Sequence, residues 1–168
     1  METVITGLII IGVLVLSVLG LAESSLSAQA QIAEATRTMQ ERAQERARTD
    51  LAPVNATTTV LGDYVEITLR NTGDTKLADF EQWDVILRYT DSLGGYHVEW
   101  YGYPTQWTSQ IYQTTSPVTP EVIDPGILNP GEEIVVQVHV SPGVGTGTTN
   151  LASVSTLNGV TASTVFTR

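Results

Sequence analysis

The chain has 168 residues, a net charge of −10 and no cysteine, so disulfides and thiolate metal sites are excluded. Residues 1–52 carry six acidic and four basic side chains, whereas residues 53–168 carry twelve and four, which places −8 of the charge in the second region. Nucleic acid is excluded as a partner, because phosphate binding requires clustered Lys and Arg.

The chain begins with a strongly apolar segment. Thr3 to Ala22 form a run of twenty residues without a charge, and 13 of the first 22 residues are Val, Ile or Leu. Burying each of these side chains gains ~1.5–3 kcal/mol. A domain built from the residues after Pro53 has no spare core to cover them on all sides. The segment must therefore lie in lipid or among other apolar helices.

No Lys or Arg precedes Arg37, whereas a secretory signal peptide has a basic start and a shorter apolar stretch. We therefore expect the segment to belong to the working protein. Two fates are open to it, a permanent anchor or a temporary passage through the membrane into a helical bundle. All eleven aromatic residues lie after residue 60, so the helix lacks the aromatic belt that permanent anchors often use. This favours the second fate.

The helical pattern continues beyond the apolar segment to about Arg48, and Pro53 ends it. At 1.5 Å per residue such a helix would be roughly 70 Å long, while a bilayer core needs only ~30 Å. Apolar and small residues recur every three or four positions along its second half, which predicts a narrow apolar stripe at Ala28, Ile32, Ala35, Met39, Ala43 and Ala47.

After Pro53 the pattern is that of β-strands. Alternating runs separated by turn residues predict strands at 64–69, 83–89, 96–101, 134–140, 152–157 and 160–166, with hairpin turns at 91–95 and at Asn158-Gly159. A Pro-rich connection (Pro117, Pro120, Pro125) and a Gly/Thr-rich loop (Ser141–Asn150) separate them. Seven or eight such strands are typical of an immunoglobulin-like sandwich. We therefore predict an α+β fold, with an N-terminal helix over 1–52 and an antiparallel β-sandwich over 53–168.

Catalytic motifs are absent from the sequence, and no enzymatic activity is expected. His97 and His139 lack metal-site spacing and are predicted to be structural. The nearby acids Asp74, Asp79, Glu81 and Asp84 allow either a weak Ca²⁺ site or simple solvation, with solvation favoured and no metal assigned.

Two further features have both a structural and a functional interpretation. Asn55 lies in the one N-glycosylation sequon, Asn-Ala-Thr, which predicts a modification site just after the helix. Five aromatic side chains allow a binding surface, although such residues more often build a sandwich core, and core is favoured for Trp83, Trp100, Tyr101, Tyr103 and Trp107.

An apolar helix that continues into an amphipathic one and then a β-sandwich resembles archaellins and the wider type IV pilin-like superfamily. The resembling stretches are Glu2–Leu16, Val65–Gly73 and Leu128–Ile134. Bacterial type IV pilins usually carry a glutamate where Ile5 stands here, which favours the archaellin type. Glu2 is the nearby acid, and it either complements the positive end of a helix or is solvated.

The resemblance implies export, removal of a leader by a prepilin peptidase with Met1 as the candidate mature N-terminus, and ATPase-driven assembly of a homopolymer. The expected function is a subunit of an extracellular, archaellum-like motility filament that passes through the membrane before assembly. Alternatives are an adhesive type IV-like pilin and a single-pass anchored sandwich that serves as a binding or accessory module. The residues expected to pack in the filament core are Val4, Ile5, Leu8, Ile11, Val15, Leu19 and Leu26.

Overall fold

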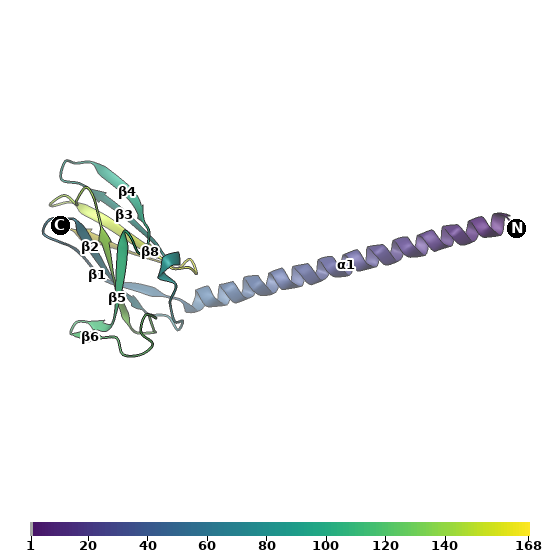
Figure 1. Ribbon diagram of the computed structural model, residues 1–168, viewed down its shortest axis with the longest axis horizontal. Coiled ribbons are helices and arrows are strands. Elements are labelled where there is room, and N and C mark those ends of the chain that lie inside the picture. Colours follow the sequence, from purple (N-terminus) through teal and green to yellow (C-terminus); the bar gives the residue numbers. More distant parts are fainter. Residues whose placement is uncertain (1) are drawn as a thin grey trace. The chain divides into compact units, whose positions relative to one another are not determined.

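The computed structural model describes the backbone of residues 2–168 and the side chains from Ile5 onward. The chain forms two compact units, one up to Ala43 and one of Gln44–Arg168. Helix α1, Glu2–Arg48, is continuous, and its predicted end near Arg48 is confirmed (Figure 1). Its last turn carries Arg46 and Arg48, whose charges are favourable at the negative end of a helix.

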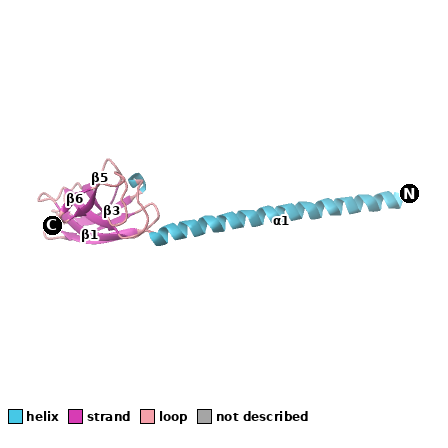
Figure 2. Ribbon diagram, turned by 90° about the horizontal axis from the view of Figure 1, so that it is seen from below, coloured by secondary structure: helices cyan, strands magenta, loops and turns pink. Residues whose placement is uncertain are grey.

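The second unit is a sandwich of two antiparallel sheets. Its strands are coloured magenta in Figure 2. One sheet has the order β1-β2-β7-β5-β6 and the other β4-β3-β8-β9. A short 3-10 helix, η1, spans Phe80–Gln82. The strands are β1 Leu51–Thr58, β2 Tyr64–Asn71, β3 Asp84–Thr90, β4 Tyr96–Tyr101, β5 Trp107–Thr115, β6 Val118–Pro120, β7 Glu133–His139, β8 Thr149–Ser155 and β9 Thr161–Thr167.

Both predicted hairpins are confirmed. Strands β3 and β4 pair around the turn that ends at Gly95, and β8 and β9 pair around Asn158-Gly159, where Gly159 has the positive φ that the turn requires. The alternating side chains of both sheets meet in one core that contains Val65, Leu87, Leu128 and Val136, all with no exposed surface. The predicted α+β sandwich is therefore confirmed.

The structure corrects the strand prediction in two places, and the described residues contain nine strands rather than seven or eight. Two residues separate the end of the helix from strand β1, which contains Pro53. The sheet accepts this proline because β1 is an edge strand with a bulge between Pro53 and Asn55. Within the Pro-rich connection, β6 pairs with the equally unpredicted β5.

The prediction that the aromatic residues belong to the core holds for most of them but not for Trp100. Trp83 and Trp107 are buried, Tyr101 is buried, and Tyr103 is packed against the core. Trp100 is 57% exposed because it lies on the outer side of β4, where its indole N–H donates to Asp84 at 2.8 Å.

Candidate functional site: the apolar helix and the sandwich surfaces

From Ile5 onward, the apolar half of α1 has no cover within its own unit. The described side chains predicted to pack in a filament core are between 52% and 71% exposed, namely Ile5, Leu8, Ile11, Val15, Leu19 and Leu26. The side chain of Val4 lies outside the described residues. From Ile5 onward, the helix is long and apolar enough to cross a membrane, with a mean hydropathy of 2.7 over its most apolar window.

In its apolar half, the helix satisfies the hydroxyl of Ser17 internally. The hydroxyl of Ser17 donates to the carbonyl of Val13 at 2.8 Å, so this polar group needs no outside partner. Further along, Arg37 and Glu41 form an exposed i,i+4 ion pair at 3.0 Å. The first half of α1 therefore suits an apolar environment and the second half an aqueous or mixed one.

The end of α1 is held by a turn of the sandwich that belongs to the same compact unit. The amide of Asp74 donates to the carbonyl of Arg48 at 2.8 Å, and the amides of Thr72 and Gly73 donate to Asp50. Only glycine fits at Gly73, because a Cβ there would collide with backbone atoms of Arg48 and Asp50. We call this arrangement the helix socket, defined by Arg48, Asp50 and Thr72–Asp74.

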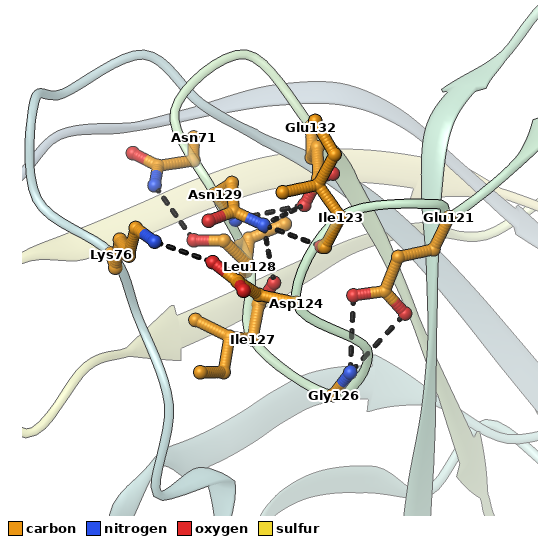
Figure 3. Close-up of polar contacts among 10 residues, drawn as sticks. All are labelled: Asn71, Lys76, Glu121, Ile123, Asp124, Gly126, Ile127, Leu128, Asn129 and Glu132. Carbon is orange, nitrogen blue, oxygen red and sulfur yellow. Dashed lines mark hydrogen bonds and ion pairs between the residues drawn. The ribbon is translucent and has the colours of Figure 1, made fainter.

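Beside the socket, the two segments of the sandwich named in the family resemblance, Val65–Gly73 and Leu128–Ile134, meet at Asn71 (Figure 3). The side-chain amide of Asn71 donates to the carbonyls of Thr75 and Leu128 at 2.8 and 3.1 Å. The backbone adds two bonds, from Asn71 N–H to the carbonyl of Glu132 and from Gly131 N–H to the carbonyl of Asn71. The Asn71 and Leu128–Glu132 segments are therefore one structural element, distant in sequence and joined in space.

Asn129 organises the loop that leads into β7. Its side-chain amide donates to the carbonyls of Ile123 and Ile127 and to the carboxylate of Glu132, while its own backbone N–H also donates to Glu132 (Figure 3). On the same loop Asp124 forms an ion pair with Lys76 at 2.5 Å. These contacts tie the second part of the Pro-rich connection, around Ile123–Ile127, to the start of the loop before β7 and to Lys76.

On the outer side of the other sheet, β4 presents a row of apolar side chains. Tyr96, Val98 and Trp100 are 68%, 58% and 57% exposed. Sequence reasoning assigned Trp100 to the core and did not single out the other two. The alternation Tyr96-x-Val98-x-Trp100 was visible, but one sequence does not reveal which strands lie at sheet edges or which face is outward.

The inward side of β4 carries a polar cluster around His97. Its Nε2 lies 2.9 Å from Oδ2 of Asp91, its Nδ1 lies 3.4 Å from Glu99, and its ring stacks on Tyr89. The hydrogen bond with Asp91 raises the pKa of His97 and lowers the pKa of the Asp91 carboxyl. The structural role predicted for His97 fits this packing, while His139 lies at the end of β7 with its ring against Tyr64.

The acids of the calcium prediction occupy different local environments. Asp74 takes part in the helix socket, Asp79 precedes η1, which includes Glu81, and Asp84 accepts the bond from Trp100. Among the described residues, no three His, Asp or Glu side chains form a group that could hold a metal ion. Calcium binding stays a prediction, and titration calorimetry without heat on addition of Ca²⁺ would rule it out.

Asn55 is exposed on the edge strand β1, where an attached glycan would meet solvent. The predicted modification stays a prediction. A measured mass equal to that of the unmodified chain would contradict it.

No protein-family model matches the chain, and no curated protein matches it in sequence. Among solved structures, the archaeal flagellum of Methanospirillum hungatei strain JF1 matches with a TM-score of 0.62 at 12% identity, covering 96% of this chain and 90% of that one. The archaellum periplasmic stator protein FlaG from Sulfolobus acidocaldarius matches with a TM-score of 0.52 at 21% identity, covering 70% of this chain and 99% of that one.

The stator complex of FlaF and FlaG from the same organism gives a TM-score of 0.51 at 20% identity, covering 69% of this chain and 87% of that one. At these identities the likeness concerns the fold. The chain therefore has an archaellin-like fold, in which a long apolar N-terminal helix precedes an antiparallel β-sandwich, and it shares this fold with components of the archaellum.

Proposed function

We propose that this protein is a structural subunit of an archaellum-like extracellular filament and has no catalytic role. The observation that carries the proposal is the continuous apolar surface of α1, whose side chains from Ile5 to Leu26 are exposed in the single chain. The similarity to the archaeal flagellum supports it, since that match extends over 96% of the chain and so includes helix and sandwich.

The physical reason for polymerisation is burial of this surface. Each fully buried Val, Ile or Leu side chain gains about 1.5–3 kcal/mol, and identical helices provide the matching surface. Gly7, Gly12 and Gly20 have open space where a Cβ would lie, so neighbouring helices have room to approach closely at these positions. Head-to-tail contacts that do not close into a ring produce an open helical polymer.

Before assembly the same helix would reside in the membrane, and the acidic sandwich would lie outside the cell. Cleavage by a prepilin peptidase and assembly by an ATPase-driven machine belong to this proposal through the family resemblance. In the filament, the sandwich would form the hydrophilic outer layer.

The test replaces one apolar helix residue by an acid. Leu8→Asp or Ile11→Asp should abolish filaments in negative-stain micrographs of the secreted fraction, because each buried carboxylate would lack a partner in the helical core. Gln40→Asp, at an exposed position in the second half of α1, is the matched control and should assemble normally. Normal filaments from Leu8→Asp would refute the proposal.

A second candidate is a membrane-anchored, stator-like accessory module of the archaellum. It is favoured by the sequence identity to the stator structures, 20–21% over 69–70% of this chain, against 12% for the filament match. Fractionation separates the two candidates. A filament subunit appears in sheared extracellular filaments, whereas a stator-like module stays in the membrane fraction, and motility tracking of a deletion strain distinguishes swimming from adhesion.

A further inference from the structure

Strand β4 ends its sheet and has one partner, β3, among the described strands. Asp91 N–H donates to the carbonyl of Gly95 at 2.9 Å, which makes that pair hydrogen-bonded and fixes the alternation along the ladder. His97 and Glu99 therefore bond to β3. The N–H and C=O groups of Tyr96, Val98 and Trp100 point to the free edge.

This edge lacks the protection that β1 and β6, the two edges of the other sheet, have. Strand β1 contains Pro53 and a bulge, and β6 has only three residues, follows Pro117 and ends with Pro120. Strand β4 has no proline and no lysine, and its outer side is apolar. Natural proteins cover or interrupt such an edge, because it is a template for another strand.

The sequence of β4 is complementary to itself. When two copies lie antiparallel about Val98, the Val98 of each copy faces the other, and Tyr96 of each lies opposite Trp100 of the other. On the opposite side of the strand, His97 of each copy lies opposite Glu99 of the other, which pairs a base with an acid. Aromatic pairs and opposite charges across a strand pair each contribute roughly 0.2–1 kcal/mol.

The edge is also prepared for this contact. The Trp100 ring is held by its bond to Asp84, and His97 by its bond to Asp91 and its stacking on Tyr89. The raised pKa of His97 favours the charged imidazolium that Glu99 of a second copy would meet. The N–H and C=O groups of Val98, the central residue, face outward. This is what a hydrogen-bonded pair of Val98 with Val98 of a second copy on a twofold axis requires.

We propose that β4 pairs antiparallel with β4 of a second copy, with Val98 at the twofold axis, and joins two four-stranded sheets into one continuous sheet. This contact goes beyond the proposed function. A polar filament has no twofold axes between subunits, so the paired form is a state outside the polymer, in which membrane-inserted chains cover their apolar edges.

The absence of cysteine from the chain allows a direct test of the register. In the full chain in detergent micelles, Val98→Cys should form a disulfide-linked dimer under mild oxidation, because residues opposite each other in a hydrogen-bonded pair have Cα atoms about 5.5 Å apart. Val165→Cys is the matched control, since Val165 is 59% exposed on β9 of the same sheet. It should give at least tenfold less dimer.

The proposed register also predicts which other cysteine pairs should cross-link. Tyr96→Cys alone should not cross-link, since two copies of residue 96 would be about 14 Å apart along the strands. A mixture of Tyr96→Cys chains and Trp100→Cys chains should cross-link. Equal cross-linking by Val98→Cys and Val165→Cys, or by Tyr96→Cys alone and the mixture, would overturn the proposal.

A charge introduced at the twofold axis distinguishes pairing through β4 from association through α1. Val98→Lys places two like charges face to face and should convert the dimer to monomer in light scattering, whereas Val165→Lys should leave it intact. Filament formation tests the other proposal independently, because Leu8→Asp acts on the helix and Val98→Lys on the sandwich. If Val98→Lys left the dimer intact, pairing through β4 would be refuted.

Discussion

The guanidinium of Arg70 on β2 reaches across the sheet to the carboxylate of Glu133 on β7, the residue directly opposite in the register, with Nε 3.1 Å from Oε1. Glu133 is 1% exposed, and its second oxygen accepts the N–H and hydroxyl of Thr115 on β5 at 2.6 and 2.5 Å. One buried carboxylate thus connects three strands.

Arg70→Ala should destabilise the sandwich by about 1–3 kcal/mol, because the buried carboxylate keeps its charge and loses two charge-assisted donors. Unfolding of the full chain in detergent micelles by urea, followed by tryptophan fluorescence, measures the loss. Arg88→Ala, at an exposed arginine on β3, is the matched control and should change stability by less than about 0.5 kcal/mol. Equal effects of the two variants would contradict the role given to Arg70.

Glu133 also predicts a pH dependence on the acid side. Burial raises the pKa of Glu133, but the hydrogen bonds from Thr115 and the Arg70 guanidinium outweigh it and hold the pKa below the ordinary value of 4.5. The stabilisation is therefore complete above pH 4.5 and is lost as the pH falls through the lowered folded-state value. Glu133→Gln should flatten this part of the curve of urea midpoint against pH, and an unchanged acid slope would contradict the assignment.

For His97 we expect the opposite change near neutral pH, a loss of stability as the pH rises. Its pKa is raised above 6.5 in the folded state, first by the hydrogen bond with Asp91, so its contribution is complete below pH 6.5 and is lost as the pH rises through the folded-state value. The thermal midpoint should fall over that window, and His97→Gln should remove the fall. His139→Gln should leave it in place, and a fall that persists in His97→Gln would show that His97 is not its source.

Asn129→Ala should loosen the connection between β6 and β7 while leaving the sheets intact. The substitution removes three side-chain bonds, to Ile123, Ile127 and Glu132, and a lost buried partner costs about 1–3 kcal/mol. Hydrogen exchange should become faster at the amides of residues 123–128 and stay slow in β7. Asn55→Ala, on the exposed edge strand, is the control, and equal exchange in both variants would argue against this role.

The spacing of apolar and turn residues predicted those elements whose pattern is set by residues close together in the sequence. The helix to Arg48 and the β8–β9 hairpin around Asn158-Gly159 depend on neighbours in sequence, so one sequence revealed them. Strand β1 was missed because Pro53 is acceptable only at an edge, and edges are decided by tertiary pairing.

The need for tertiary information also decides which surface and core residues could be predicted. The helix residues were found because a run of aliphatic side chains needs no tertiary information. Trp100 was assigned to the core because an aromatic residue is usually buried, and its outward direction follows from the registration of β4 with β3. Glu133 follows Glu132 in sequence, and only the folded register shows which of the two meets Arg70.

The helix socket has a mechanical consequence. A tension that travels along the chain from α1 meets the bonds to Arg48 and Asp50 before it reaches β1, so these short amide–carbonyl links bear the load first. Gly73 lets them close without a gap. The turn Thr72–Asp74 follows β2 directly, so the socket passes part of the load to β2 and the load does not fall on β1 alone.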